Sequence, residues 1–167
     1  MPQVLIKHRW TDAVLYTHET TAERQASGLA MRDALEAACK ARANLADANL
    51  ADAYLADAKL ADAYLADANL AGAYLAGAKV RGHQLVGDRP FLQISPIGSR
   101  CAQMTLWLTK EEPYIQTGCF FGTRNEFEAA VSANHGYNNH GNEYTAALVL
   151  IDAHTSLWMP AEVEAAK

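Results

Sequence analysis

The chain has 167 residues, of which half are hydrophobic, and its formal net charge is −5. Residues 1–42 carry six basic and five acidic side chains, residues 43–87 carry three and five, and residues 88–167 carry five and nine. Because no segment has the basic excess of a phosphate-binding protein, we expect no direct binding of nucleic acid.

A β-hairpin followed by a helix is the first predicted element. Residues 4–7 and 13–17 are short β-prone runs with a turn between them. Thr20 stands three residues before Glu23, which is the capping-box spacing that begins a helix. Apolar residues at helical spacing then predict one helix that runs into residue 43.

Residues 43–87 repeat nearly the same five residues nine times: ANLAD, ANLAD, AYLAD, AKLAD, AYLAD, ANLAG, AYLAG, AKVRG and HQLVG. On an α-helix such leucines would spiral around the whole surface, and on a flat strand they would alternate between faces. Both problems vanish if the Asp or Gly that closes each unit forms a corner. The chain then coils with Ala and Leu inward and about twenty residues per coil.

This pattern resembles the pentapeptide-repeat family, whose signature is A(D/N)LXX. Eight of the nine units keep Ala first and eight keep Leu third. The resemblance implies that residues 43–87 form a right-handed quadrilateral β-helix, a solenoid of about two coils.

Coil geometry sorts the repeat into columns, because residues about twenty apart share one face. Inside, Leu45, Leu65 and Leu85 are expected to form a stack of three. Outside, the expected columns pair Asn49 with Asn69, Tyr54 with Tyr74, and Lys59 with Lys79. At the corners, the expected pairs are Asp47 with Asp67, Asp52 with Gly72, Asp57 with Gly77, and Asp62 with Gly82.

A small tail follows the repeat. Residues 91–94, 102–108 and 114–121 are predicted strands. Thr123 with Glu126 forms a second capping box, and Asn142 is the expected cap of a last helix. The tail is therefore predicted to be a β-β-β-α-α unit.

The sequence thus predicts a mainly β protein with α elements in three parts: a hairpin and capping helix (1–42), the solenoid (43–87) and an α/β unit (88–167). The first coil of a solenoid exposes its core and unpaired strand edges. We expect the hairpin and helix to cover them; the alternative is an independent binding element.

The tail carries a wider and looser resemblance. Its stretches DRPFLQI, PIGSR and GCFFGTRNEFEAAV are similar to pentapeptide-repeat proteins of bacteria and their phages. This resemblance supplies no catalytic residues and implies a modulator or inhibitor of a bacterial host process. We therefore expect a non-enzymatic module that binds a bacterial protein.

Catalytic and metal sites have little support in the residues. Paired ligands at short spacing, typical of structural zinc, are missing from the set Cys101, Cys119, His135, His140 and His154. Cys119 lies between apolar residues in a predicted strand, where a buried thiol is ordinary packing. We expect no cofactor, metal or catalytic residue; a ligand-binding or metal-binding tail is the alternative.

The outer columns hold the candidate binding residues. Tyr54 and Tyr74 would form an exposed aromatic pair, which suits an interface anchor or simply stabilises neighbouring strands. Lys59 and Lys79 place like charges in one column, which mildly destabilises the sheet unless an acid such as Asp57 or an anionic ligand lies close. Two solvated lysines are the simpler interpretation.

Some pentapeptide-repeat proteins imitate DNA to protect gyrase, and Asp47 and Asp67 would be candidate residues for such a role. The repeat has five aspartates against Lys59, Lys79 and Arg81. Duplex DNA shows about one charge per 1.7 Å, far more than this net charge provides. We therefore expect no gyrase mimicry.

Targeting signals are missing from the sequence as given. The start MPQVLIKHRW is interrupted by charges, no apolar run approaches about 18 residues, and the three cysteines are widely spaced. We expect a cytoplasmic protein without a membrane segment. Because an open solenoid edge invites pairing, we also expect a homodimer.

Overall fold

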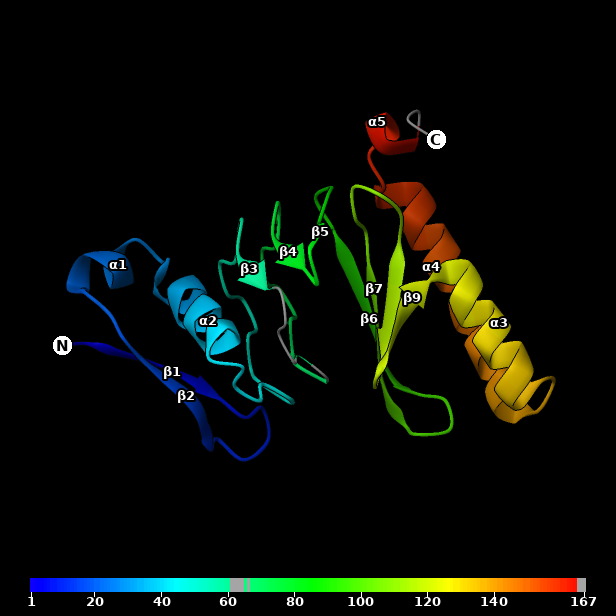
Figure 1. Cartoon of the computed structure of the whole chain (residues 1–167), viewed down its shortest axis with the longest axis horizontal. Helices are drawn as coiled ribbons and strands as arrows, with labels where there is room; N and C mark the ends of the chain where they lie inside the picture. Colours follow the sequence, from blue (N-terminus) through cyan, green and yellow to red (C-terminus); the bar gives the residue numbers. More distant parts are fainter. Residues whose placement is uncertain (61–64, 66, 165–167) are drawn as a thin grey trace. The chain divides into compact units, whose positions relative to one another are not determined.

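In the computed structural model, which describes residues 1–60, 65 and 67–164, the chain divides into two units, Met1–Leu85 and Val86–Lys167 (Figure 1). The first unit holds the hairpin, two helices and the repeat. The second unit holds a sheet and three helices. Each is described by itself below.

The first unit begins with the expected hairpin. Strands β1 (Gln3–Lys7) and β2 (Val14–Glu19) pair antiparallel, which confirms that prediction. The single predicted helix is wrong, because the chain forms α1 (Ala22–Ala26) and α2 (Ala30–Lys40). The cap of α1 is Thr21 rather than Thr20, since the Thr21 hydroxyl accepts the Arg24 N–H at 3.2 Å.

Helix α2 provides the small-residue face that packs in this unit. Its buried side consists of Ala30, Ala34, Leu35, Ala38 and Cys39. Because most of these side chains are small, the helix can approach the neighbouring backbone closely. It contacts both strands of the hairpin and strand β3 (Lys59–Leu60) of the repeat. The helix therefore joins the hairpin to the repeat.

The repeat folds with the predicted period. Parallel pairing joins Asn49 to Asn69, Tyr54 to Tyr74, and Lys59 to Lys79, each pair twenty residues apart. We call residues 43–60 the first tier, and residues 65 and 67–80 the second tier. Backbone hydrogen bonds of 2.8–3.0 Å link the tiers, with N–H groups donating in both directions.

Inside the tiers, the third-position side chains are buried as predicted: Leu45, Leu50, Leu55, Leu60, Leu65, Leu70, Leu75 and Val80. The alanines at the first position of each unit also point inward. On every second side of the coil they are fully buried, and on the other sides they are partly exposed. Ala48, Ala58, Ala68 and Ala78 are fully buried, whereas Ala43, Ala53 and Ala73 are half-buried.

Each described corner of the repeat is a hydrogen-bonded β-turn. The leucine carbonyl accepts the N–H of the next unit's alanine, as in Ala58 to Leu55 at 3.1 Å. The closing residue has a positive φ, about 56–57° at the aspartates and 70–71° at Gly72 and Gly77. This geometry matches a type II turn, and it explains why each unit closes with Asp or Gly. Asp62, an expected corner, lies outside the described residues.

The ninth unit, residues 83–87, does not continue the coil. After β4 (Lys79–Val80) the chain reverses through Arg81 and Gly82, both at positive φ, and returns as β5 (His83–Gln84), antiparallel to β4. Two consecutive left-handed residues make a type I′ hairpin turn. Leu85 therefore donates its N–H to Ala78 instead of continuing the column of Leu45 and Leu65, so the expected stack of three is wrong.

The second unit contains a four-stranded antiparallel sheet in chain order: β6 (Phe91–Ile97), β7 (Ala102–Trp107), β8 (Tyr114–Thr117) and β9 (Phe120–Thr123). One predicted strand, 114–121, is thus two. Gly118, at φ +54°, opens the two-residue loop between β8 and β9, as in a type II′ turn. Cys119 lies in this loop and is exposed, so the expected buried thiol is wrong.

Three helices complete the second unit: α3 (Arg124–His135), α4 (Asn139–Trp158) and α5 (Ala161–Glu164). The Thr123–Glu126 capping box is confirmed. Asn138, rather than Asn142, caps α4, and its side-chain oxygen accepts the Gly141 N–H at 2.9 Å. No helix in the described ranges is long and apolar enough to cross a membrane.

Helices α3 and α4 lie along the sheet and close the core of this unit (Figure 1). The core combines the inward side chains of β7 and β8 with one side of each helix. Its buried members include Met104, Leu106, Ile115, Phe127, Val131, Tyr144, Leu148 and Ile151. The buried side of α4 includes Tyr144, Ala147, Leu148 and Ile151.

Candidate functional site

Tyr54 and Tyr74 form a stacked pair on the outside of the repeat. Their ring centroids are 5.3 Å apart and their planes differ by 17°. The parallel bridge between the two residues holds both rings at neighbouring positions on one face. Tyr54 remains 48% exposed and Tyr74 49%, so the stack presents about half of its surface to solvent.

The next outer column holds Lys59 and Lys79, which pair directly in β3 and β4. Both residues are exposed, and like charges placed side by side on a sheet are mildly destabilising. Neither ammonium group has an ion-pair partner within the described ranges. The column is therefore a local site of positive charge that an acidic group could neutralise.

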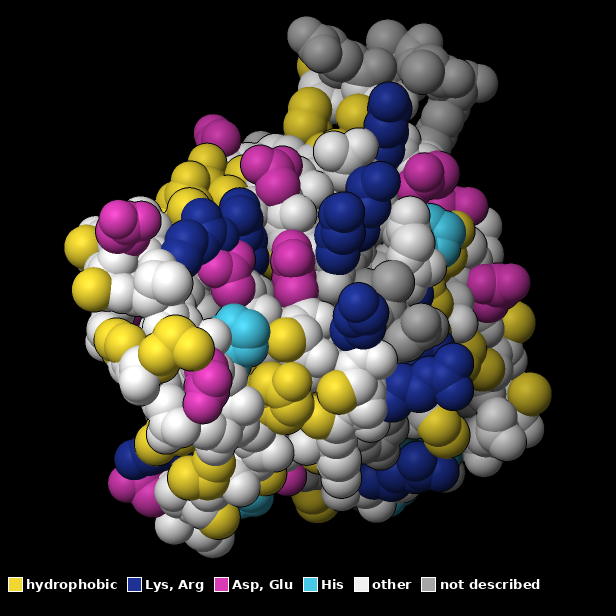
Figure 2. Space-filling view, turned by 60° about the vertical axis from the view of Figure 1, so that its left-hand side comes forward, with side chains coloured by type: hydrophobic (Ala, Val, Ile, Leu, Met, Phe, Trp, Pro, Cys, Tyr) yellow, Lys and Arg dark blue, Asp and Glu magenta, His cyan; other side chains and the backbone are white. Residues whose placement is uncertain are grey.

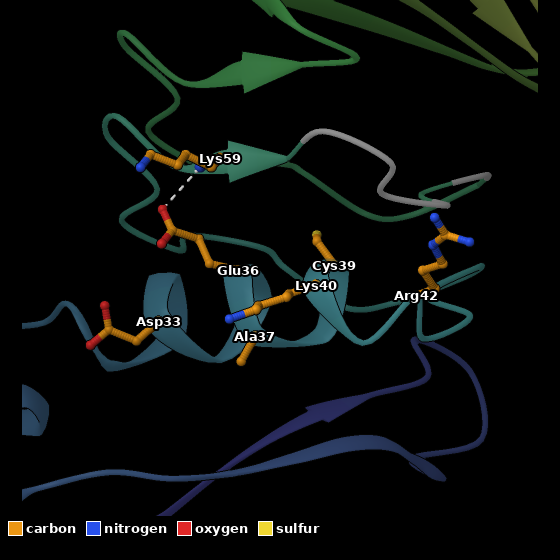
Figure 3. A pocket seen from close by; sticks show the side chains of 7 residues that line it. All are labelled: Asp33, Glu36, Ala37, Cys39, Lys40, Arg42 and Lys59. Atoms are coloured by element: carbon orange, nitrogen blue, oxygen red, sulfur yellow. Dashed lines mark hydrogen bonds between the residues drawn. The ribbon is translucent and has the colours of Figure 1, made fainter.

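Below Lys59, a cavity of about 560 Å³ lies between α2 and the first tier (Figure 3). Figure 3 shows Glu36 reaching from α2 toward β3, where its carboxylate accepts the Lys59 backbone N–H at 2.9 Å. The cavity is lined by Asp33, Glu36, Ala37, Cys39, Lys40, Arg42 and Lys59. Its two carboxylates are engaged, whereas its cationic residues Lys40, Arg42 and Lys59 are exposed.

Asp33 at one end of this cavity is held by Arg24. The guanidinium donates two hydrogen bonds to the carboxylate, at 2.6 and 2.5 Å. These hydrogen bonds lower the pKa of Asp33, against the opposing effect of partial burial. Asp33 is therefore a structural carboxylate that fixes α1 against α2.

The candidate acids Asp47 and Asp67 lie beside basic residues of the hairpin. His8 Nε2 is 3.9 Å from Asp47 Oδ2, and the Arg9 backbone N–H donates to the Asp47 carbonyl at 2.8 Å. The Arg9 guanidinium donates to the carbonyl of Asp67 at 2.8 Å. The hairpin tip thus places positive charge next to this corner column.

Sequence reasoning missed the residues that meet the free edge of the first tier. Besides Glu36 and Arg9, the Lys7 carbonyl accepts the Asn49 N–H at 2.7 Å, and Arg32 donates to the Ala56 carbonyl at 3.2 Å. From the sequence, we expect the hairpin and helix to cover the first coil, but the sequence predicts no individual contact. Their pairing depends on tertiary geometry that no local pattern specifies.

In the second unit, two of the five cysteines and histidines considered as zinc ligands share a cavity. Cys119 and His135 both line a cavity of about 450 Å³, whereas Cys101, His140 and His154 do not. His154 instead hydrogen-bonds the Arg89 carbonyl at 3.0 Å. Among the residues that the structure describes, no three His, Cys, Asp or Glu side chains cluster as metal ligands.

The tyrosine stack and the lysine column are better suited to binding a partner than to catalysing a reaction. Basic side chains stand next to acidic and hydrophobic ones on the face shown in Figure 2. The repeat offers a flat aromatic stack and ammonium groups, which bind partners through contact area and charge.

Comparison with protein families gives one match. The family model of pentapeptide repeats matches residues 43–82, with eight copies. The ninth unit, residues 83–87, lies outside the match, in agreement with the reversal of the chain at Arg81 and Gly82. Comparisons with curated proteins and with solved structures gave no match.

Proposed function

Residues 43–82 are a pentapeptide-repeat segment, and from this premise we propose that the chain is a non-enzymatic protein-binding protein. Proteins with such repeats are generally protein-interaction modules. The exposed Tyr54–Tyr74 stack carries the proposal. The partner is a bacterial protein, and binding modulates or inhibits a host process.

The scaffold in this proposal is a short right-handed quadrilateral β-helix capped at its N-terminal end. Parallel pairing at twenty-residue spacing and a turn at each described corner support the coil. Four groups on the free side of the first tier support the cap, because each hydrogen-bonds to the hairpin or to α2: Asp47 O, Asn49 N–H, Ala56 O and Lys59 N–H. A rigid scaffold lowers the entropy cost of presenting side chains to a partner.

Tyr54 and Tyr74 serve as the anchor of the interface. Tyrosine gives large contact area with only two side-chain torsions to immobilise, and stacking already restricts these two rings. Asn69 donates its side-chain amide to Asn49 at 3.2 Å in the preceding column, so that column is ordered as well. The outer face is therefore organised before a partner arrives.

Lys59 and Lys79 select a partner surface with negative charge. They follow Tyr54 and Tyr74 by one repeat unit each, so the lysine column stands on the next side of the coil. A carboxylate of the partner between the two ammonium groups would relieve their repulsion. The proposed partner surface thus combines an apolar patch with adjacent acids.

DNA mimicry fits the corner geometry poorly. A mimic needs carboxylates in rows, but Asp52 and Asp57 face Gly72 and Gly77 in the second tier. The remaining described pair, Asp47 and Asp67, lies next to His8 and Arg9. We expect no inhibition or protection of gyrase supercoiling at micromolar protein, and no effect of replacing Asp47 and Asp67 by Asn.

The test is capture of partners from bacterial lysate by the wild-type chain and by the double variant Tyr54→Ser/Tyr74→Ser, with identification by mass spectrometry. We expect a saturable partner that the double variant fails to retain. Tyr137→Ser is the matched control, because Tyr137 is 97% exposed and lies in the second unit. This control should retain the partner.

Reconstitution with the purified partner completes the test. If the double variant folds with an unchanged circular dichroism spectrum and binds as the wild type does, the tyrosines merely stabilise the tiers. Native mass spectrometry of the purified protein addresses the ligand-binding alternative, because a stoichiometric copurifying metal or nucleotide would favour it.

A further inference from the structure

The cavity of about 450 Å³ in the second unit lies outside the repeat and is untouched by the proposed protein-binding role. It is formed where the β8–β9 turn meets the turn after β6, one side of α3 and the first turns of α4. The lining residues are Ser99, Arg100, Thr117, Cys119, Phe120, Phe127, Ala130, Val131, Asn134, His135 and Tyr144. Its size falls in the range of about 300–1,000 Å³ that holds small organic ligands.

The floor of the cavity is apolar and aromatic. Phe127, Val131 and Tyr144 are each at least 93% buried. The Phe127 ring meets Phe120 edge-on at 5.4 Å and Tyr144 edge-on at 5.5 Å. These contacts hold a rigid set of rings, against which a flat apolar group could pack.

The rim has one formal charge, and it is positive. Among the residues that line the cavity, all of them described, Arg100 is the only Lys, Arg, Asp or Glu. A Cβ built on Gly118 would lie 3.0 Å from an Arg100 guanidinium nitrogen, so the guanidinium sits against the β8–β9 turn. Ser99, Asn134 and His135 also line the cavity and contribute hydroxyl, amide and imidazole groups.

The nearby carboxylates are used elsewhere. Glu143 accepts the Gly98 N–H at 2.8 Å, and Glu126 accepts the Thr123 N–H at 2.7 Å in the capping box. No ion-pair partner of Arg100 occurs in the described ranges. A ligand that supplies one negative charge would therefore complete the charge balance of the cavity.

We propose that this cavity binds a small aromatic carboxylate. The carboxylate lies on Arg100, whose planar guanidinium can donate two parallel hydrogen bonds to it. The aromatic body packs on Phe120, Phe127 and Tyr144. A cationic ligand of the same shape finds no lining carboxylate, and a neutral one leaves the guanidinium unpaired.

The experiment titrates the full-length, ¹⁵N-labelled chain with benzoate, phenylacetate and indole-3-acetate, and with phenylacetamide and phenethylamine as neutral and cationic counterparts of phenylacetate. Amide chemical shifts report the site. We expect at least one carboxylate to shift the amides of Arg100, Gly118 and His135 below ~10 mM. Phenylacetamide and phenethylamine should bind about ten-fold more weakly than phenylacetate.

Variants assign the effect to the guanidinium. Arg100→Gln should weaken carboxylate binding about ten-fold and remove the preference over the neutral amide. Arg89→Gln is the matched control, since Arg89 lies over the Trp158 ring, away from the cavity lining, and should bind as the wild type does. The Arg100 side chain is exposed, so its replacement should leave the folded spectrum unchanged.

Three results would overturn the proposal. The first is the absence of shifts at the cavity amides with all three carboxylates. The second is equal binding of phenethylamine and phenylacetate. The third is unchanged carboxylate affinity in a folded Arg100→Gln chain.

Discussion

At two corners of the repeat, an Asp side chain of the first tier occupies the space that a Cβ in the second tier would need. A Cβ on Gly77 would lie 2.2 Å from Asp57 Oδ1, and one on Gly72 would lie 2.1 Å from Asp52 Oδ1. Real Cβ atoms do not approach so closely, and both glycines also have a positive φ. A side chain at Gly72 or Gly77 would therefore displace the Asp carboxylate of the first tier, whereas the Asp47–Asp67 corner has aspartate in both tiers.

We expect Gly77→Ala to destabilise the chain by about 1–3 kcal/mol, from strain and from displacement of the Asp57 carboxylate. Denaturant midpoints measure the loss. The double variant Asp57→Gly/Gly77→Ala should show smaller additional destabilisation from the alanine, because the clash is gone. Gly82→Ala is the control, since Gly82 has a positive φ but no atom near its Cβ.

An alanine cost at Gly77 that is the same with and without the Asp57 carboxylate would contradict this packing argument. A cost equal to that of Gly82→Ala would point to backbone strain alone.

The Arg24–Asp33 pair predicts a pH dependence. The folded-state pKa of Asp33 is lowered, so its contribution to stability is present above the unfolded pKa of about 4 and is lost as the pH falls through the folded value. The stability difference between wild type and Asp33→Asn should therefore shrink on acidification from neutral pH. Asp12→Asn, at the exposed hairpin tip, is the control and should show no comparable change.

Urea midpoints across this pH range provide the measurement. A wild-type advantage over Asp33→Asn that stays constant down to about pH 2 would show that the ion pair does not stabilise the fold.

At the scale of elements, Glu36 links α2 to the repeat. Its carboxylate accepts the Lys59 N–H, which otherwise faces away from the second tier. Glu36→Ala should cost about 0.5–1.5 kcal/mol, and Glu36→Gln should cost less because the amide oxygen still accepts. Hydrogen exchange of the Lys59 amide should accelerate in Glu36→Ala.

The Lys79 amide is the internal control for that experiment, because it donates to the Ala58 carbonyl within the repeat. Equal acceleration at both amides would indicate general loosening of the repeat rather than loss of one acceptor.

At the scale of elements, the sequence alone predicts much of the repeat but not its end. The five-residue period correctly predicted the twenty-residue pairing, the inward leucines and the Tyr54–Tyr74 stack, because identical units leave one consistent geometry. The period also predicted that Leu85 would continue the column of Leu45 and Leu65. The turn at Arg81 and Gly82 reverses the chain before Leu85 can do so. This turn depends on positive φ angles at two consecutive residues, and the units AKVRG and HQLVG still resemble the repeat closely enough to hide it.

Misplaced boundaries elsewhere have similar causes. The run 114–121 looks like one strand because Gly118 is flanked by β-prone residues, yet its positive φ permits a hairpin. The cavity around Arg100 could not be predicted either. Its walls come from two turns and two helices, and only the folded chain brings them together.

At the scale of the whole molecule, self-association remains a prediction. Strand β5 covers β4 on the C-terminal side of the repeat, so the chain shields part of that edge itself. We expect the rest to pair with a second copy, because open strand edges invite pairing. Sedimentation should then give twice the chain mass of 18.1 kDa.

Dilution supplies the control for this prediction, since a specific dimer dissociates with a defined concentration dependence. A mass equal to one chain throughout the micromolar range would remove the homodimer.

Parallel pairing at a spacing of twenty residues also restricts how the repeat can lengthen or shorten. Inserting a single unit of five after Leu60 would set Tyr74 against Lys59 and Asn69 against Tyr54. It would also bring Asp67 against Asp52, where the chain now places a glycine. Inserting four units copied from one tier would preserve every column and add one more tyrosine to the exposed stack. The outer face therefore keeps its columns only when the repeat gains or loses whole turns of twenty residues. The tyrosine column and the lysine column must then lengthen or shorten together.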